Sequence, residues 1–172
     1  MCYLDFMTKK LPEHVSILPP ATGLSGICEP ILRSAPQWFG IETSIQEYVS
    51  RIAELPTVLA VHIDPHTQEQ KAVGFMSIEQ LFPSSAELHV LCIRPEWHRK
   101  GIGEALLSAS EAHARRIGAR FLQVKTVSPK KSCDYYTRTR KFYEAVGFSP
   151  LTEFPTLWDP DCPCLQMIKV LD

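Results

Sequence analysis

The chain of 172 residues is long enough to build one domain with a full hydrophobic core, so residues 1–172 are expected to form a single domain. Its apolar fraction of 45% and charged fraction of 22% are typical of globular proteins and exclude a disordered or fibrous chain. The formal net charge of −1 provides no broad positive field, so nucleic-acid binding is not expected as the main activity.

The first ten residues lack the pattern of a secretory signal, because the basic residues between Met1 and Lys10 follow the apolar ones. No apolar run reaches membrane-spanning length either, so a cytoplasmic protein without a membrane partner is expected. In that compartment cysteines stay reduced. The six cysteines are Cys2, Cys28, Cys92, Cys133, Cys162 and Cys164. One Cys-Pro-Cys without a second Cys/His pair is weak evidence for zinc, and no metal site is expected.

In the first half of the chain we expect a strand, two helices and a hairpin. An alternating run predicts a strand over His14–Leu18, which the following two prolines would stop. Apolar residues at helical spacing predict helices over Ile27–Trp38 and Ser44–Glu54. A polar turn between two β-branched or aromatic runs predicts an antiparallel hairpin of Thr57–Ile63 with Ala72–Ile78.

In the second half, strands and helices alternate. An apolar run predicts a strand over Glu87–Ile93, and a long amphipathic pattern predicts a helix over Gly101–Ile117. A buried strand is expected over Phe121–Val127, then a helix over Tyr136–Val146 and a last strand over Leu165–Val170. This order of elements indicates an α/β protein without repeats or linkers.

The segment 95–107 places two glycines and two cations at the start of an expected helix. Helix starts hold phosphate oxygens on unpaired backbone N–H groups, and Gly101 and Gly103 would let the backbone approach an anion closely. Two other phosphate-binding motifs do not fit. A Walker A loop requires Lys-Ser/Thr where Glu104 follows the second glycine, and a dinucleotide fingerprint requires a small residue where Leu106 stands.

The run His98-Arg99-Lys100-Gly101-Ile102-Gly103 resembles the central motif of GNAT superfamily N-acetyltransferases, Arg/Gln-x-x-Gly-x-Gly/Ala, with His98 in place of the usual Arg or Gln. Thr139–Phe148 is similar to the family's late helix, which ends in Phe/Tyr-Tyr-Glu-x-x-Gly-Phe. The resemblance implies an α/β (α+β) fold with a mixed, mostly antiparallel central sheet of six to seven strands and about four helices. It also implies direct transfer of an acetyl group from the cosubstrate acetyl-CoA to a primary amine.

The same resemblance implies that residues 98–104 hold the pyrophosphate of CoA. The cofactor-binding residues implied in this loop are His98, Arg99, Lys100, Gly101, Ile102, Gly103 and Glu104. Arg99 and Lys100 could touch the phosphates or simply be solvated. The preceding strand is expected to separate from its neighbour near Leu91, Cys92 and Ile93, so that backbone groups bond the pantetheine arm. Tyr136 stands where the family often carries an Asn, and that contact is not expected here.

Acetyl transfer requires a neutral amine, so a base must remove a proton, and an acid helps the thiolate to leave. Tyr143 stands where the resembled family places its acid, although a core aromatic is the alternative. Strand alternation puts Glu87 and His89 on one face, and either of them, or a water chain, is the candidate base. An ion-paired Glu87 and a neutral, hydrogen-bonded His89 are the structural alternatives. An acyl-enzyme on Cys92 is not expected, because activation would need a paired base or cation and the resembled family normally transfers the acetyl group directly.

Two other functions are compatible with these motifs: a non-catalytic acyl-CoA sensor of the same fold, and a protein-interaction domain in which the glycines only begin a helix. The acceptor would be an amine on a small molecule or a protein, and the sequence does not choose between them. Acceptor choice is expected to depend on Trp38-Phe39-Gly40 and on a loop over Pro155–Pro163 with Trp158 at its middle, unless these aromatics cover the core. A homodimer is compatible with the resemblance, but no interface pattern selects an oligomeric state.

Overall fold

One sheet runs through the part of the chain that the structure, a computed structural model, describes, namely residues 10–172. Its strands are β1 (Val15–Ala21), β2 (Thr57–Ile63), β3 (Gln70–Phe82), β4 (Ser85–Ile93), β5 (Phe121–Val127), β6 (Ser149–Asp159) and β7 (Cys162–Val170). The helices are α1 (Ser25–Arg33), α2 (Glu42–Glu54), α3 (Ile102–Arg116) and α4 (Asp134–Ala145), with a short 3-10 turn, η1, at Pro95–Trp97. The predicted α/β class is therefore confirmed.

The strands lie in the order β1-β2-β3-β4-β5-β7-β6. Every neighbouring pair is antiparallel except β4 and β5, which run parallel. A parallel pair needs a long crossover, and α3 supplies it between β4 and β5. The mostly antiparallel sheet of six to seven strands with four helices, expected from the resemblance, is thus the fold that forms.

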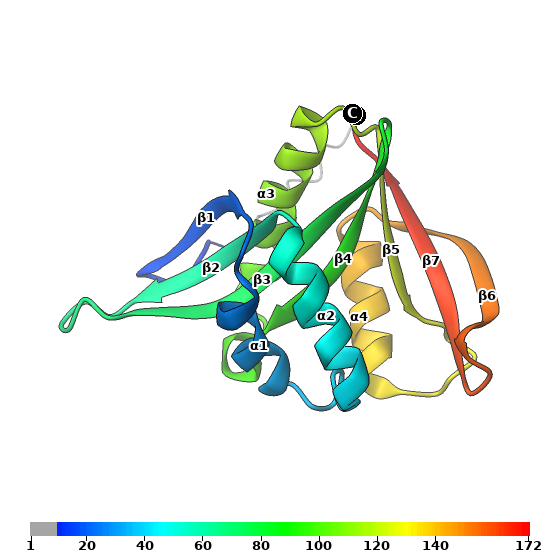
Figure 1. Cartoon of the computed structure of the whole chain (residues 1–172), viewed down its shortest axis with the longest axis horizontal. Coiled ribbons are helices and arrows are strands. Elements are labelled where there is room, and N and C mark those ends of the chain that lie inside the picture. Colours follow the sequence, from blue (N-terminus) through cyan, green and yellow to red (C-terminus); the bar gives the residue numbers. More distant parts are fainter. Residues whose placement is uncertain (1–9) are drawn as a thin grey trace, which may run out of the picture.

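Helices cover both faces of this sheet (Figure 1). One core cluster joins the sheet to α3 and α4 and includes Leu106 and Tyr143. The other joins it to α1 and α2 and includes Ile31 and Ile52. Each large aliphatic side chain buried in this way stabilises the fold by roughly 1.5–3 kcal/mol. The sheet therefore separates two cores, and the site described below lies where β4 passes between them.

Two boundaries near the N-terminus differ from the expectation. Strand β1 continues through Pro19 and Pro20 to Ala21. It can contain prolines because it is an edge strand, and no strand on its outer side requires an N–H donor from them. Helix α1 ends at Arg33 instead of Trp38. Pro36 disfavours a helical conformation in the residue before it, so the chain leaves the helix and Trp38 lies in the α1–α2 connection.

The expected loop over Pro155–Pro163 is wrong, because residues up to Asp159 belong to β6 and β7 already begins at Cys162. The two strands form a hairpin whose tight turn is closed by the Asp159 carboxylate, which accepts the Asp161 N–H at 2.8 Å. Prolines hid this strand in the sequence, but β6 is the outer edge of the sheet and tolerates them. Trp158 lies on this edge strand and is half exposed.

Among residues 10–172, none of the helices has the length and apolarity that crossing a membrane requires. Five cysteines of this range are free thiols, and no three metal-binding side chains gather there. Cys2 and the stretch Met1–Lys9 lie outside the described residues.

Candidate active site

A bulge in β4 centres on His89. Strands β3 and β4 pair Ile78 with Leu88 and Ser77 with Val90, which leaves His89 as an extra residue. An inserted residue reverses the side-chain alternation of a strand. Accordingly, Leu88 belongs to the core under α3 and α4, whereas Val90 belongs to the core under α1 and α2.

Strand β4 parts from β5 at the same point. Their parallel pairing runs from Ser85 with Phe121 to Leu88 with Val124 and then stops, and the two strands diverge (Figure 1). Leu91, Cys92 and Ile93 continue to pair with β3 on the other side. Backbone groups of successive residues point to opposite neighbours, and the Arg94 N–H donates to Val73 of β3, so Cys92 also faces β3 whereas Leu91 and Ile93 face β5. In the described sheet the backbone groups of Leu91 and the Ile93 N–H therefore have no strand partner, which makes them available to a ligand that lies between the strands.

The turn from η1 into α3 depends on two left-handed residues, Arg99 with φ 62° and Gly101 with φ 79°. Gly101 is the N-cap, and no side chain caps the helix there. The first N–H groups of α3 are thus left for an anion or solvent. Gly103 also has a packing role, because a Cβ there would meet the Phe142 ring at 3.2 Å. Gly103 lets α4 pack against the start of α3.

His98 folds back onto β4. Its Nε2 lies 2.7 Å from the Ile93 carbonyl oxygen, so the ring donates to one of the backbone groups near the strand separation. Its ring also contacts Trp38 edge to face, with centroids 5.6 Å apart. Lys100 lies 4.8 Å from the centre of the Trp97 ring. The two side chains therefore help to fix the loop that carries them.

Trp38 connects this loop to α4. Its indole Nε1 donates to Thr139 Oγ1 at 3.1 Å, and its carbonyl accepts from the Tyr136 hydroxyl at 3.1 Å. The ring also packs on Tyr135, with centroids 5.0 Å apart. The sequence predicts a role for Trp38 in acceptor choice but contains no local signal for its hydrogen bonds to α4. Tyr136, which replaces the family's Asn, therefore holds the α1–α2 connection.

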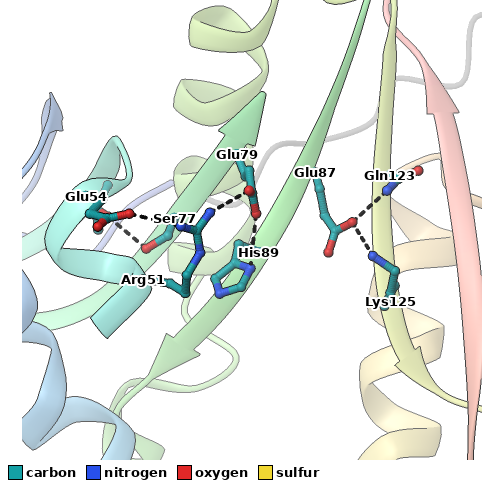
Figure 2. A network of polar contacts seen from close by, with 9 residues as sticks. Arg51, Glu54, Ser77, Glu79, Glu87, His89, Gln123 and Lys125 are labelled. Atoms are coloured by element: carbon teal, nitrogen blue, oxygen red, sulfur yellow. Dashed lines mark hydrogen bonds and ion pairs between the residues drawn. The ribbon is translucent and has the colours of Figure 1, made fainter. Parts of the chain in front are cut away.

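Glu87 is the more buried of the two candidate bases, with a side chain only 9% exposed. One of its oxygens, Oε2, accepts from Lys125 Nζ at 2.5 Å and from Gln123 Nε2 at 2.6 Å (Figure 2). The ion-paired alternative for Glu87 is therefore what the structure contains.

His89 lies on the same side of the sheet as Glu87 (Figure 2). Burial lowers the pKa of its imidazole below the ordinary value, although the nearby Glu79 and Glu87 carboxylates oppose that shift. The ring is therefore neutral at neutral pH. Its Nδ1 lies 3.7 Å from Glu79 Oε2, whereas its buried Nε2 has no hydrogen-bond partner among residues 10–172.

Tyr143 lies in α4 and is 4% exposed. Its ring packs against Phe142 and Phe148, with centroids 5.3 and 5.5 Å away. Burial raises the pKa of its phenol, because the phenolate would lose its hydration. The hydroxyl consequently keeps its proton at neutral pH, as a proton donor must. Tyr143 is at once a core aromatic and a phenol in the acid form.

Cys92 has the surroundings of a structural thiol. Burial raises its pKa to about 12, and its Sγ points at the Ile31 carbonyl oxygen 3.4 Å away. A thiol with so high a pKa holds almost no thiolate at neutral pH and is a poor nucleophile. The geometry thus agrees with the expectation that no acyl-enzyme forms on this residue.

Four polar residues around the candidate bases were not predicted from the sequence: Arg51, Glu79, Gln123 and Lys125 (Figure 2). The expected strand over Ala72–Ile78 ended one residue before Glu79, whereas β3 continues to Phe82. Strand register alone pairs Glu79 with Glu87. A longer β3 was the only sequence signal that could have linked the two carboxylates.

Comparison with known proteins identifies the family. The model of the acetyltransferase (GNAT) domain matches residues 58–150. None of the curated proteins matches the sequence.

Several solved structures share the fold. A GNAT-family protein from Desulfovibrio desulfuricans is 18% identical and superposes with a TM-score of 0.73, covering 92% of this chain and 99% of its own. A GNAT acetyltransferase from Elizabethkingia anophelis with acetyl-CoA bound is 15% identical, with a TM-score of 0.67 over 93% of this chain and all 100% of its own. An aminoglycoside 6′-N-acetyltransferase complexed with coenzyme A is 19% identical, with a TM-score of 0.65 over 92% and 97%.

The family model covers more than half of the chain, including the bulged strand, the glycine loop and the helix of Tyr143, and the surrounding fold agrees with it throughout. The chain therefore belongs to the acetyltransferase (GNAT) domain family.

Proposed function

We propose that this protein transfers an acetyl group directly from acetyl-CoA to a primary amine of an acceptor molecule. The observation that carries the proposal is that β4 separates from β5 after Leu88. The separated part of β4 lies between His89 with its polar neighbours and the loop that leads to the helix start at Gly101. An anion site, unpaired strand groups and a candidate base thus adjoin one another, as transfer from an acylated, phosphate-bearing carrier requires.

The residues fit acetyl-CoA as a cosubstrate. The unpaired N–H groups of Ile102, Gly103 and Glu104 would hold its pyrophosphate, since they begin α3 without a side-chain cap. Arg99 and Lys100 would add positive charge at the loop, and His98 would keep the loop against β4. Leu91 and the Ile93 N–H would bond the pantetheine arm through the backbone groups that β5 leaves unpaired, whereas the backbone of Cys92 is paired with Phe75 of β3. Acetyl-CoA itself supplies the activated thioester.

The protein's own groups would manage two protons. An alkyl ammonium has a pKa of about 10, so His89 or Glu87, directly or through water, would take a proton from the amine before it attacks the carbonyl carbon. A C–N bond then forms and the C–S bond breaks. Tyr143, which keeps its proton because it is buried, would donate it to the departing sulfur. The amine nitrogen loses its second proton as the adduct collapses to the amide, and a proton returns to the Tyr143 phenolate through solvent. The net reaction yields the amide, the CoA thiol and one proton, without a covalent enzyme intermediate.

Binding is tested by calorimetric titration of the protein with acetyl-CoA. We expect saturable binding by the native protein and none by a Gly101→Val/Gly103→Leu variant, because Gly101 has a left-handed φ and a side chain at 103 would displace Phe142. A folded native protein that does not bind acetyl-CoA would contradict the proposal.

Transfer is tested by following thiol release from acetyl-CoA with a panel of small primary amines and peptides. Tyr143→Phe should lower kcat on the order of a hundredfold and leave acetyl-CoA affinity within about threefold of the native value. Acetyl-CoA binding without turnover of any amine would instead favour the non-catalytic acyl-CoA sensor.

A further inference from the structure

Two glutamates occupy paired positions on β3 and β4. Register pairs Glu79 with Glu87, and their carboxylates turn apart, that of Glu79 toward Arg51 and His89 and that of Glu87 toward Gln123 and Lys125 (Figure 2). Like charges directly opposite one another destabilise a sheet. Neither side chain is well solvated, since they are 28% and 9% exposed. A pairing of two poorly solvated carboxylates costs stability, and such arrangements are typical of functional sites.

Each carboxylate is held by a cation from a different element. Arg51 of α2 donates to Glu79 Oε1 at 2.5 Å, while Lys125 of β5 donates to Glu87 Oε2 at 2.5 Å. The second oxygen of Glu79, Oε2, is the one that faces His89 Nδ1 at 3.7 Å. Arg51, Glu79 and His89 thus form a chain in which the Glu79 carboxylate lies between a cation and the imidazole.

The imidazole is arranged to accept a proton at one nitrogen. Nδ1 faces the carboxylate, so an N–H at that position is favoured, which leaves the lone pair on the buried and unpartnered Nε2. The bulge places this ring on the face of the sheet that α1 and α2 cover, beside Tyr48, with ring centroids 5.7 Å apart. The ionisable groups that face His89 are Tyr48 and Arg51 from α2, Glu79 from β3, Glu87 from β4 and Lys125 from β5.

We infer that Glu79 is a positioning residue that orients His89 and stabilises its imidazolium, and that Arg51 limits this effect by neutralising Glu79. The inference rests on the proposed function, in which His89 takes the amine proton. Of the two candidate bases it selects His89, because Glu87 is already committed to Lys125 and Gln123. The proton would pass from the ammonium to Nε2 and return to solvent after transfer, so Glu79 itself never changes its charge.

The inference makes opposite predictions for two partners in one ion pair. Glu79→Gln removes the carboxylate that stabilises the imidazolium, so the titration of His89 should move to lower pH by about one unit. Arg51→Gln leaves the carboxylate without its cation, so the same titration should move to higher pH. Glu54→Gln removes the other partner of Arg51, at 3.0 Å on an exposed side chain, and should move it by less than about 0.3 unit.

The measurement is a pH titration of the imidazole signals by NMR on the isotopically labelled protein, with the signal of His89 identified by its loss in His89→Gln. This readout needs no acceptor. Opposite shifts in the two variants support the inference, whereas shifts of one sign, or none beyond that of Glu54→Gln, would overturn it. Glu79→Asp and Arg51→Lys, which keep the charges, should retain most of the native behaviour and show that a shift does not come from unfolding.

A kinetic readout separates this inference from the proposed function. With the best amine of the panel, Glu79→Gln should lower kcat on the order of tenfold and shift the acid limb of kcat/KM to lower pH. Turnover with unshifted profiles in both variants would refute the inference alone. Absence of turnover with every amine would refute the proposed function, while the NMR titration would still decide whether Glu79 and Arg51 control His89.

Discussion

The glycine loop between β4 and α3 and the polar cluster around His89 are only a few residues apart in the chain, yet they are built in different ways. The loop is contiguous, and its geometry comes from backbone conformation at Arg99 and Gly101. The polar cluster takes its side chains from four elements, namely α2, β3, β4 and β5. A contiguous backbone site can be recognised from a short motif, whereas a site of converging side chains exists only after the sheet has formed.

Because the glycine loop depends on backbone conformation and the polar cluster on charge pairing, the two regions should tolerate different substitutions. In the loop, a change matters if it alters φ or blocks packing, as at Gly101 and Gly103. In the cluster, a change matters if it leaves a charge without its partner, because Glu87 is buried and an unpaired buried carboxylate is costly. Substitutions in the loop and in the polar cluster therefore test these two expectations separately.

The largest effect is expected at the backbone of the loop. Gly101→Val forces a β-branched residue into a left-handed conformation, which costs roughly 1–3 kcal/mol, and should weaken acetyl-CoA binding on the order of a hundredfold in calorimetry. Gly26→Ala is the matched control, because Gly26 has an ordinary φ and no atom within 4 Å of an added Cβ. Equal losses in both variants would mean that the loop conformation is not what holds the cosubstrate.

The next effect tests the polar cluster. Lys125→Met leaves Glu87 charged and without its cation, so the free energy of unfolding in urea should fall by about 2 kcal/mol. Adding Glu87→Gln should restore at least half of that loss, because the double variant contains no unpaired charge. If the two losses simply add, the pair is not coupled and the cluster does not depend on converging charges.

A smaller effect is expected at Trp38, which contacts His98 of the glycine loop and Thr139 of α4. Trp38→Phe keeps an aromatic ring but removes the donor to Thr139 Oγ1, and should cost about 1 kcal/mol of unfolding free energy. Thr139→Val removes the acceptor and should cost a similar amount, and the double variant should lose less than the sum. Strict additivity in this cycle would show that the bond does not connect the α1–α2 loop to α4.

The smallest effect is a pH dependence. Burial depresses the pKa of His89 in the folded protein below the value of 6.5 that an unfolded histidine has, so the unfolded state binds the proton more strongly. The fold therefore loses stability as pH falls through about 6.5 toward the folded pKa. Native protein should lose more unfolding free energy between pH 7.5 and pH 5.5 than His89→Gln does. Equal losses in urea melts would contradict burial of a neutral His89.

Most of the fold was predictable from local patterns. Strands β2 and β5 have the bounds that the sequence predicts, Thr57–Ile63 and Phe121–Val127, because continuous β-branched and apolar runs set them. Strand β6 was missed, and β1 was cut short at its prolines, because the tolerance of an edge strand for proline depends on sheet order. The prolines disfavoured a strand in the local sequence, but a strand forms there because it lies at the edge of the sheet.

The candidate site was predictable in part. Its loop residues 98–104 and Tyr143 came from the family motifs, and the candidate bases Glu87 and His89 came from strand alternation. Their roles in binding and catalysis are still proposals. The pairing of Glu87 with Lys125, the approach of Glu79 to His89 and the bonds of Trp38 to α4 were not predictable. These contacts join residues separated by 10 to 101 positions, and no local periodicity records them.

By itself the sequence determined the class of the fold, the helix start at Gly101 and the family motifs, since backbone conformation and hydrophobic periodicity are local properties. Only the tertiary structure decided that a bulge at His89 turns β4 from one core to the other and that β5 departs there. It also decided which cation neutralises which carboxylate. Strand register and the packing of α2 set the distances between these charged side chains. Both depend on how the side chains of the whole core pack together, which no local segment determines.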